Sequence, residues 1–352
     1  MERFSIHRDE TGDRFYGFPD IVCTASGKLI AVFLETTTHI NRDRSRICLK
    51  ESRDQGETWE NFRYLTEPGT AAAAFNCPRV TRLHDDTLVI ICDFNREFDS
   101  RQKDENGNFV AETDSRLWIW RGDSEGTAFS EPELLPFPGM VPDRLRELTN
   151  GRWLVTAHID YGKGGHPLAV FASYSDDRGE TWSDAVPVAV DPELALCECC
   201  VCEYKPGRLV ALLRENSDRG LGAFKVFSDD GGESWYGLTE TALTACHRPV
   251  IDRLSDGRFL VTYRLRPGGK RSGNTITLGA FLPVEALEAE QRSDCTVRLF
   301  PLEYDRNRSP DNGYTGFVEL DDGAVYVINY VKDDLPKCQI RGYRFYPSEW
   351  IL

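Results

Sequence analysis

The sequence predicts an all-β fold, a six-bladed β-propeller of four-stranded antiparallel blades. Two internal repeats predict it. One is an octapeptide with the pattern S-x-D-x-G-x-T-W, found as Ser52–Trp59, as Ser175–Trp182 and, with Ser in place of Thr, as Ser228–Trp235. The other is a pair of short apolar runs around a tight turn, which occurs six times. Self-similarity of this kind indicates one supersecondary unit used repeatedly.

The octapeptide has the chemistry of a hairpin turn. Its Asp carboxylate accepts hydrogen bonds from backbone N–H groups, and its Gly takes a positive φ angle. The Trp covers the turn and packs inward.

The six paired runs predict the blades. Their turns are Ser26-Gly27, Asp85-Asp86, Asn150-Gly151, Pro206-Gly207, Asp256-Gly257 and Asp322-Gly323. Apolar β-rich runs around such turns are hairpins. Six of them in 352 residues leave 352/6, or about 59, residues for each, which suits a four-stranded blade with its loops. Because no linker interrupts the pattern, we expect residues 1–352 to form a single domain.

The octapeptides follow the turns of copies one, three and four, where strands three and four of a blade belong. Copy two keeps a decayed version, Gly122–Gly126. At the ends, Arg3–Ile6 and Ile340–Phe345 read as strands of one blade, which would close the ring and remove an open edge. A polar insertion, Asn95–Ser115, forms a rim loop or lid of blade two, and Pro283–Glu290 forms a short helix.

Composition excludes several classes of protein. The net charge of −15 argues against a nucleic-acid surface. The sequence contains no run of 18 apolar residues, so we expect no transmembrane helix. The N-terminus shows no signal peptide, so the eleven cysteines are expected to be reduced thiols of a cytoplasmic protein. No calcium-loop motif is present, and we expect no cofactor.

The run Cys197–Cys202 has the spacing C-x-C-C-x-C. On a strand, this spacing sends alternate side chains to opposite faces, unlike the C-x₂-C loop of a zinc site. We therefore expect buried thiols and no metal.

The innermost strands of a propeller line a central channel, so residues near their starts converge. The ninth position before the turn residue holds Phe18, Cys77, Pro142, Glu198, Arg248 and Tyr314. A Glu, an Arg and a Tyr at one level of one channel predict a site there.

The octapeptides resemble the Asp boxes of the sialidase superfamily, whose members are six-bladed β-propellers with the boxes away from the active site. The resemblance implies a Tyr nucleophile at the start of blade six and a Glu base at the start of blade four. Tyr314 and Glu198 hold these positions. A Tyr avoids the repulsion that a carboxylate nucleophile would meet at an anomeric carbon bearing a carboxylate, and it is a known exception among glycosidases.

The resemblance also implies three arginines that grip the substrate carboxylate through charge-assisted bonds. Arg214 matches the one in blade four. Arg271 best matches the one in blade five, with Arg264 and Arg266 as rivals.

The third arginine should open blade one in an R-I-P motif, but this chain has Gly17-Phe18-Pro19, and Arg14 is out of register. Arg79 or Arg248 from neighbouring blades would have to substitute. The acid/base Asp of the family lies in the loop that spans residues 35–43 here. Asp43 is its only Asp, and His39 stands nearer the expected place.

We therefore predict a sialidase-like exo-glycoside hydrolase for a terminal acidic sugar, with a carbohydrate as its partner. Two alternatives stay open. One is a lyase, in which an Arg neutralises a uronate while His or Tyr removes the C5 proton. The other is a propeller that binds glycans without turnover, with Tyr314 as a channel-lining aromatic and Glu198 in a structural ion pair. The sequence does not specify the sugar, the linkage or the oligomeric state.

Overall fold

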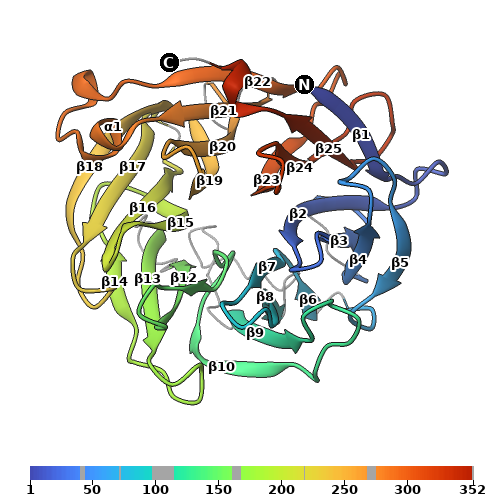
Figure 1. Ribbon diagram of the computed structural model, residues 1–352, viewed down its shortest axis with the longest axis horizontal. Helices are drawn as coiled ribbons and strands as arrows, with labels where there is room; N and C mark the ends of the chain where they lie inside the picture. The colour runs from blue at the N-terminus through green and yellow to red at the C-terminus, as the bar shows by residue number, and fades with distance from the viewer. Residues whose placement is uncertain are drawn as a thin grey trace, which may run out of the picture.

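The computed structural model describes residues 1–39, 44–70, 73–96, 115–160, 168–217, 219–267 and 275–350. Their strands form six antiparallel sheets, which follow one another around a central axis as the blades of a propeller (Figure 1). The predicted fold class is confirmed. Within the described residues, no helix is both long and apolar enough to cross a membrane.

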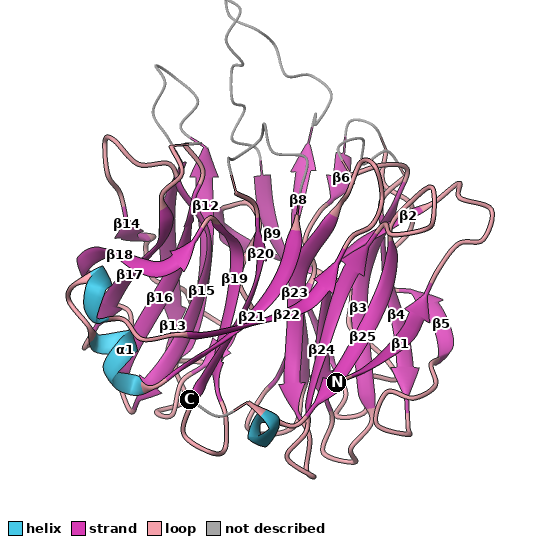
Figure 2. Ribbon diagram, turned by 90° about the horizontal axis from the view of Figure 1, so that it is seen from above, coloured by secondary structure: helices cyan, strands magenta, loops and turns pink. Residues whose placement is uncertain are grey.

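Each blade runs from an inner strand at the axis to an outer strand at the rim (Figure 1). Figure 2 shows the same ring from its side. Blades one and two comprise β2 (Phe15–Cys23), β3 (Leu29–Thr36), β4 (Arg46–Ser52) and β5 (Glu60–Tyr64), then β6 (Ala73–Phe75) with β7 (Arg79–Arg82), β8 (Leu88–Arg96), β9 (Ser115–Gly122) and β10 (Glu133–Pro138). Blades three and four comprise β11 (Arg146–Glu147), β12 (Trp153–Asp160), β13 (Leu168–Ser175) and β14 (Val186–Ala189), then β15 (Leu196–Lys205), β16 (Arg208–Glu215), β17 (Gly222–Ser228) and β18 (Tyr236–Thr244). Blades five and six comprise β19 (Cys246–Arg253), β20 (Phe259–Leu265), β21 (Ile276–Leu282) and β22 (Arg298–Tyr304), then β23 (Asn312–Glu319), β24 (Val325–Val331), β25 (Gln339–Phe345) and β1 (Glu2–His7).

The ring is closed by strands from opposite ends of the chain. β1 pairs antiparallel with β25, from Glu2 opposite Arg344 to His7 opposite Ile340. Blade six therefore takes its outer strand from the N-terminus, as expected. The short helix expected near residues 283–290 is α1 (Val284–Glu288), at the rim between blades four and five.

The Asp boxes form the turns between the third and fourth strands of blades one, three and four. In the first box, Ser52 Oγ accepts a 2.9 Å hydrogen bond from the Gly56 N–H, and Asp54 accepts one of 2.9 Å from Thr58 N–H. Trp59 Nε1 donates to the Gly56 carbonyl at 3.0 Å, which folds the indole over the turn. Equivalent bonds run from Gly179 to Ser175 and from Gly232 to Ser228.

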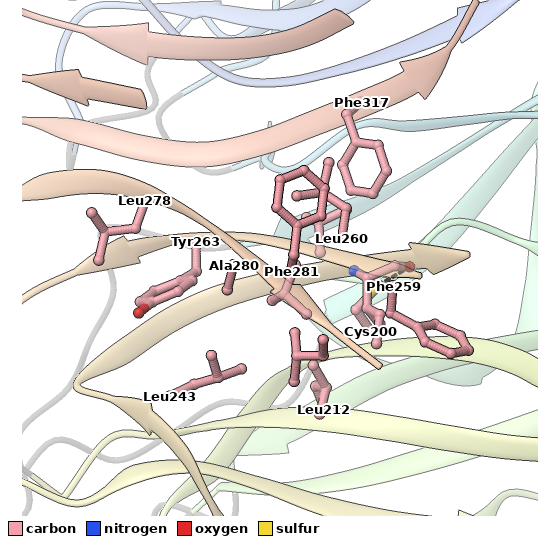
Figure 3. Close-up of a cluster of buried hydrophobic side chains, with 14 of the residues drawn as sticks. Cys200, Leu212, Leu243, Phe259, Leu260, Tyr263, Leu278, Ala280, Phe281 and Phe317 are labelled. Carbon is pink, nitrogen blue, oxygen red and sulfur yellow. Dashed lines mark hydrogen bonds between the residues drawn. The ribbon is translucent and has the colours of Figure 1, made fainter. Parts of the chain in front are cut away.

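The core lies between neighbouring blades, where apolar faces of adjacent sheets pack together. The largest cluster joins blades four, five and six, and Figure 3 shows Leu212, Phe281 and Phe317 from these three blades within it. Because both faces of the middle strands are covered, these strands are largely apolar and every residue of β3 and β24 is buried.

Four inner strands share one irregularity. In each, a residue pairs with the second strand and the register then shifts: Gly17 opposite Leu34, Cys197 opposite Arg214, His247 opposite Arg264, and Gly313 opposite Tyr330. The next residue is left-handed, with φ of 53° at Phe18, 45° at Glu198, 52° at Arg248 and 56° at Tyr314. A bulge of this kind re-aims a side chain next to a site.

Blade three differs by one residue from the alignment made on the sequence. Met140 pairs with His158, and the left-handed residue is Val141, with φ of 47°, rather than Pro142. The proline ring fixes φ near −65°, so Pro142 cannot adopt this conformation. Cys77 of blade two lies between β6 and β7, outside both strands.

Tyr326 of β24 tests how the Asp box joins blade one to blade six. Its buried hydroxyl donates to the Gly56 carbonyl at 2.9 Å and accepts from Trp59 Nε1 at 3.2 Å. We expect Tyr326→Phe to lower the free energy of unfolding by about 0.5–1.5 kcal/mol, because the hydrogen bond from its hydroxyl to the Gly56 carbonyl is lost, while that carbonyl keeps its bond from Trp59 Nε1. Tyr346→Phe, which removes an exposed hydroxyl bonded to Asp322, is the control and should cost less than about 0.5 kcal/mol in urea unfolding. Equal losses for both variants would contradict this role.

Candidate functional site

Three side chains meet where the inner strands begin, an end of the propeller that we call the site face. Arg214 Nη1 donates to Glu198 Oε1 at 2.8 Å and Oε2 at 2.9 Å, and to the Tyr314 hydroxyl oxygen at 3.1 Å. The Tyr314 hydroxyl donates to Glu198 Oε1. Arg214 Nη2 donates to Asn216 Oδ1 at 2.5 Å. The structure thus joins the predicted nucleophile, its predicted base and one predicted clamp residue.

The bulges make this cluster possible. Glu198 and Tyr314 are the left-handed residues of β15 and β23, so both side chains come to the same level of the axis. Arg214 lies in β16, beside Glu198 in the same blade.

Ion pairing and hydrogen bonding determine the protonation states of Glu198 and Tyr314. Burial alone would raise the pKa of the Glu198 carboxyl, but the charge of Arg214 and hydrogen bonds from Arg214 and Tyr314 lower that pKa far below its usual range. Burial and the neighbouring Glu198 charge raise the pKa of the Tyr314 phenol well above its usual range. The resting site therefore holds an ionised Glu198 and a neutral Tyr314 whose proton points at a carboxylate.

Arg264 of β20 adds a second buried cation. Its guanidinium carbon lies 4.8 Å from the centre of the Tyr314 ring. It donates to neutral acceptors, namely the Asn312 carbonyl at 3.4 Å and the Tyr330 hydroxyl at 3.3 Å. Among the described residues, no acidic side chain forms an ion pair with Arg264, which leaves a positive charge beside Tyr314.

His39 reaches the same face from the loop after β3. Its Nδ1 lies 2.9 Å from Asp311 Oδ2. Its ring is 5.3 Å from that of Phe18, which in turn is 5.3 Å from the Tyr314 ring. Phe18, which follows Gly17 at the position where the resemblance implies an arginine, thus packs against both His39 and Tyr314.

The two substitute arginines have internal partners. Arg248, only 1% exposed, donates to the Pro142 carbonyl at 2.6 Å. Arg79 donates to the Thr315 carbonyl at 3.0 Å and lies 3.6 Å from Asp20. Both arginines thus bind backbone carbonyl groups next to the left-handed residues of other blades.

Two predicted site residues, Asp43 and Arg271, lie outside the described part of the chain, as does most of the Asn95–Ser115 insertion. Arg266 directly follows β20, and its backbone N–H donates to the Ala245 carbonyl at 3.1 Å.

Sequence reasoning missed His158, Tyr330 and Asp311. A signal existed for the first two. The seventh residue after each turn glycine (Gly151, Gly207, Gly257 and Gly323) is His158, Arg214, Arg264 or Tyr330, respectively. These four residues lie near the ends of the second strands of their blades, at the site face. Burial and the charges of Arg248 and Arg214 lower the pKa of His158 to about 4 against the opposing effect of Glu198, so its imidazole is neutral.

The opposite end of the inner strands encloses a separate cavity of about 420 Å³. Residues of β2, β7, β11, β19 and β23 line it, and its charged residues already form ion pairs such as Arg146 with Asp252. Tyr314 and Glu198 are not among its lining residues. The site face and this cavity are therefore distinct.

The Cys197–Cys202 run lies in β15, and all four of its thiols are buried and free. Burial raises the pKa of each thiol, so they carry no charge. In the described ranges, no three His, Cys, Asp or Glu side chains gather as a metal-binding group.

The profile of the family described as BNR repeat-like domain matches residues 66–299, more than half of the chain. The chain belongs to the BNR repeat-like domain family. The match covers blades two to four and most of blade five, including Glu198, Arg214 and Arg264. The resemblance seen in the Asp boxes is thereby confirmed at the level of the family.

Solved structures similar to this BNR repeat-like propeller include several sialidases. A Dyadobacter fermentans protein of unknown function is 22% identical with a TM-score of 0.78, and the match covers 98% of this chain and 97% of that one. A Hadza microbial sialidase is 18% identical with a TM-score of 0.72, covering 99% and 69%. The intramolecular trans-sialidase of Ruminococcus gnavus is 14% identical with a TM-score of 0.68, covering 98% and 97%. These matches show a sialidase-like propeller fold.

Glu198→Gln tests the buried ion pair. The substitution leaves the Arg214 guanidinium buried without its counter-charge, so we expect a loss of about 3–5 kcal/mol in the free energy of unfolding at neutral pH. Glu198 has a depressed pKa in the folded state, so its stabilising contribution is complete above the unfolded-state pKa of about 4.3 and is lost as pH falls toward the folded-state pKa. The difference between wild type and variant should therefore narrow in acid.

Urea unfolding at about pH 7 and about pH 3 measures this difference. The matched control is Glu233→Gln, which breaks an exposed pair with Arg152 that also measures 2.8 Å. That variant should lose less than about 1 kcal/mol. A pH-independent difference for Glu198→Gln would contradict the assignment of charge.

Proposed function

We propose that this protein is a glycoside hydrolase that acts on a terminal acidic sugar, with Tyr314 as nucleophile and Glu198 as its base. The observation that carries the proposal is the hydrogen-bonded cluster of Tyr314, Glu198 and Arg214. An ionised carboxylate bonded to a buried phenol is suited to accept the phenolic proton as the oxygen attacks.

The proposed reaction has two steps. In the first, the Tyr314 oxygen bonds to the anomeric carbon, its proton passes to Glu198, and the glycosidic bond breaks as an acid from the 35–43 loop protonates the leaving oxygen. In the second, water attacks the same carbon, the loop residue takes its proton, and Glu198 returns the first proton to the released phenol. Two displacements give net hydrolysis with retained configuration. His39 is the member of the loop whose contacts are described; Asp43 is the alternative acid.

Arg264 supports an acidic substrate. A buried cation beside Tyr314, whose described partners are all neutral, favours an anion in the adjacent space. The names of the sialidases of similar fold suggest sialic acid. The blade-one arginine is replaced by Gly17, and Arg214 is already bonded to Glu198. Both features favour a related acidic sugar held by fewer arginines.

One observation favours a second reaction. The His39–Asp311 pair resembles a base with its orienting carboxylate, and it lies one aromatic ring away from Tyr314. A lyase would use these parts to remove the C5 proton of a uronate and protonate the departing oxygen, with Arg264 neutralising the carboxylate. Only this reaction forms an unsaturated uronate, whose ultraviolet absorbance separates it from hydrolysis.

The first experiment compares wild type with Tyr314→Phe on fluorogenic α-sialosides and uronides. We expect at least a 1,000-fold fall in kcat because the nucleophile is lost, a size on the order of that seen when a catalytic nucleophile is removed. Thermal unfolding monitors the fold. Tyr204→Phe, in β15 but toward the opposite end from Glu198, is the control and should keep full activity. Glycan binding without any product from wild type would instead establish a binding-only propeller.

Arg264→Met tests recognition of the substrate's acid group. We expect KM for the acidic glycoside to rise about 10–100-fold, the size of a charged hydrogen bond of about 1.5–3 kcal/mol, while KM for its methyl ester changes little. The control is Arg253→Met, which removes an exposed cation at the far end of the same blade. An equal rise in KM for the acid and for its ester would contradict a direct contact.

A further inference from the structure

His39 and Asp311 come from segments far apart in the chain and meet across the junction of blades one and six. Nδ1 of His39 lies 2.9 Å from Oδ2 and 3.1 Å from Oδ1 of Asp311. His39 follows β3, and Asp311 directly precedes β23, the strand that carries Tyr314. The contact therefore ties the loop of blade one to the nucleophile strand.

Asp311 is fixed independently of His39. Its backbone N–H donates to Asp305 Oδ2 at 2.9 Å, and its carbonyl accepts from the Lys332 N–H at 3.0 Å. Its carboxylate also accepts a 3.2 Å hydrogen bond from the Tyr330 hydroxyl, whose oxygen in turn accepts from Arg264. A continuous chain of bonds runs from Arg264 through Tyr330 and Asp311 to His39.

The carboxylate of Asp311 is ionised. Burial alone would raise its pKa, but the His39 hydrogen bond, the charge of Arg264 and the Tyr330 hydrogen bond together lower it. A carboxylate can only accept, so Nδ1 of His39 must carry a proton. The bond thereby fixes the tautomer and leaves Nε2 for a ligand.

Among the described residues, aromatic side chains surround the ring of His39. Phe15 and Phe18 of β2 face its ring at centroid distances of 5.7 and 5.3 Å, and Tyr330 of β24 at 6.2 Å. Lys337, between β24 and β25, reaches the same loop through a 2.7 Å bond from Nζ to the Thr37 carbonyl. Asp311 is the acidic partner that the described residues supply.

We propose that Asp311 is a positioning residue that holds His39 with Nε2 available to the leaving oxygen, which makes His39 the general acid of the hydrolysis proposed above. In the first step, His39 acts as an imidazolium with its second proton on Nε2. That proton passes to the glycosidic oxygen, which keeps the electron pair of the breaking bond, and the neutral Nδ1–H tautomer remains. In the second step, Nε2 takes a proton from the attacking water, so His39 ends as it began. This inference rests on the proposed function.

The experiment uses two glycosides of one acidic sugar with different leaving groups. An alcohol needs protonation to depart, whereas a nitrophenol does not. We expect Asp311→Asn to lower kcat/KM for the alkyl glycoside about 100-fold, a usual contribution of a general acid, with less than about fivefold loss on the nitrophenyl glycoside. The amide can offer an N–H to Nδ1 and so favour the wrong tautomer. His39→Gln should give the same pattern.

Two further measurements separate positioning from general structural damage. Adding Asp311→Asn to His39→Gln should lower kcat/KM for the alkyl glycoside by less than about a further twofold, because Asp311 acts through His39. Nitrogen NMR of the imidazole should show Nδ1–H for His39 in the wild type and its loss in Asp311→Asn. Asp85→Asn, an exposed carboxylate paired with Arg178 away from the site face, is the control and should change neither readout.

The outcomes distinguish the two proposals. Turnover that Tyr314→Phe abolishes, with both glycosides unaffected by Asp311→Asn and His39→Gln, would overturn the role of Asp311 and leave the hydrolase standing. Equal losses on the two leaving groups would also overturn it, since they indicate a structural effect. No turnover of any acidic glycoside by the wild type would overturn the proposed function and this inference with it. A leaving-group-dependent loss in both variants supports Asp311 and His39 together.

Discussion

Each bulged inner strand of this propeller turns at a left-handed residue, and the geometry of the site face depends on that constraint. In a regularly pleated inner strand, successive side chains would point to the two opposite faces of the sheet, toward one neighbouring blade or the other. The bulge adds one residue and re-aims the next, which brings Glu198 and Tyr314 to one level from blades four and six. Left-handed non-glycine residues cost about 1–2 kcal/mol each, so their recurrence at Phe18 and Arg248 as well means that the surrounding structure imposes them.

The buried charges follow from the same geometry. Once Glu198 is aimed inward, its carboxylate needs a cation, and the register of β15 with β16 places Arg214 beside it. That pairing keeps Glu198 ionised, but it also occupies N–H groups of Arg214 that would otherwise be available to a substrate. In the proposed reaction, recognition of the substrate's acid group therefore shifts toward Arg264, whose described partners are neutral. Gly17 at the position of the blade-one arginine, followed by the aromatic Phe18, fits a site in which the arginines of the sialidase pattern are redistributed.

The architecture could be predicted from the sequence because each blade corresponds to one copy of a sequence repeat. Six hairpin turns and three Asp boxes predicted the blades, and counting back from the turns found Glu198 and Tyr314. The same counting failed at Pro142, since it could not see that a proline cannot take the left-handed position that Val141 occupies. It placed Arg248 at the level of Glu198 and Tyr314, but it could not show the partners of Arg248 or Arg79, because these are backbone carbonyls of other blades. Asp311 lies before its strand, outside any repeated position, so only the folded chain brings it to His39.

The pairing of β1 with β25 also determines the order of events during synthesis. β1 is synthesised before the other strands of the propeller, yet its partner β25 belongs to the final blade. Blades one to five can form as they emerge, whereas the seam between blade six and blade one waits for almost the whole chain. Tyr314, Asp311 and the Tyr326 contact with the first Asp box all lie at or beside this seam. A nascent chain therefore carries an unfinished ring until blade six has been synthesised, and the candidate nucleophile enters its environment only then.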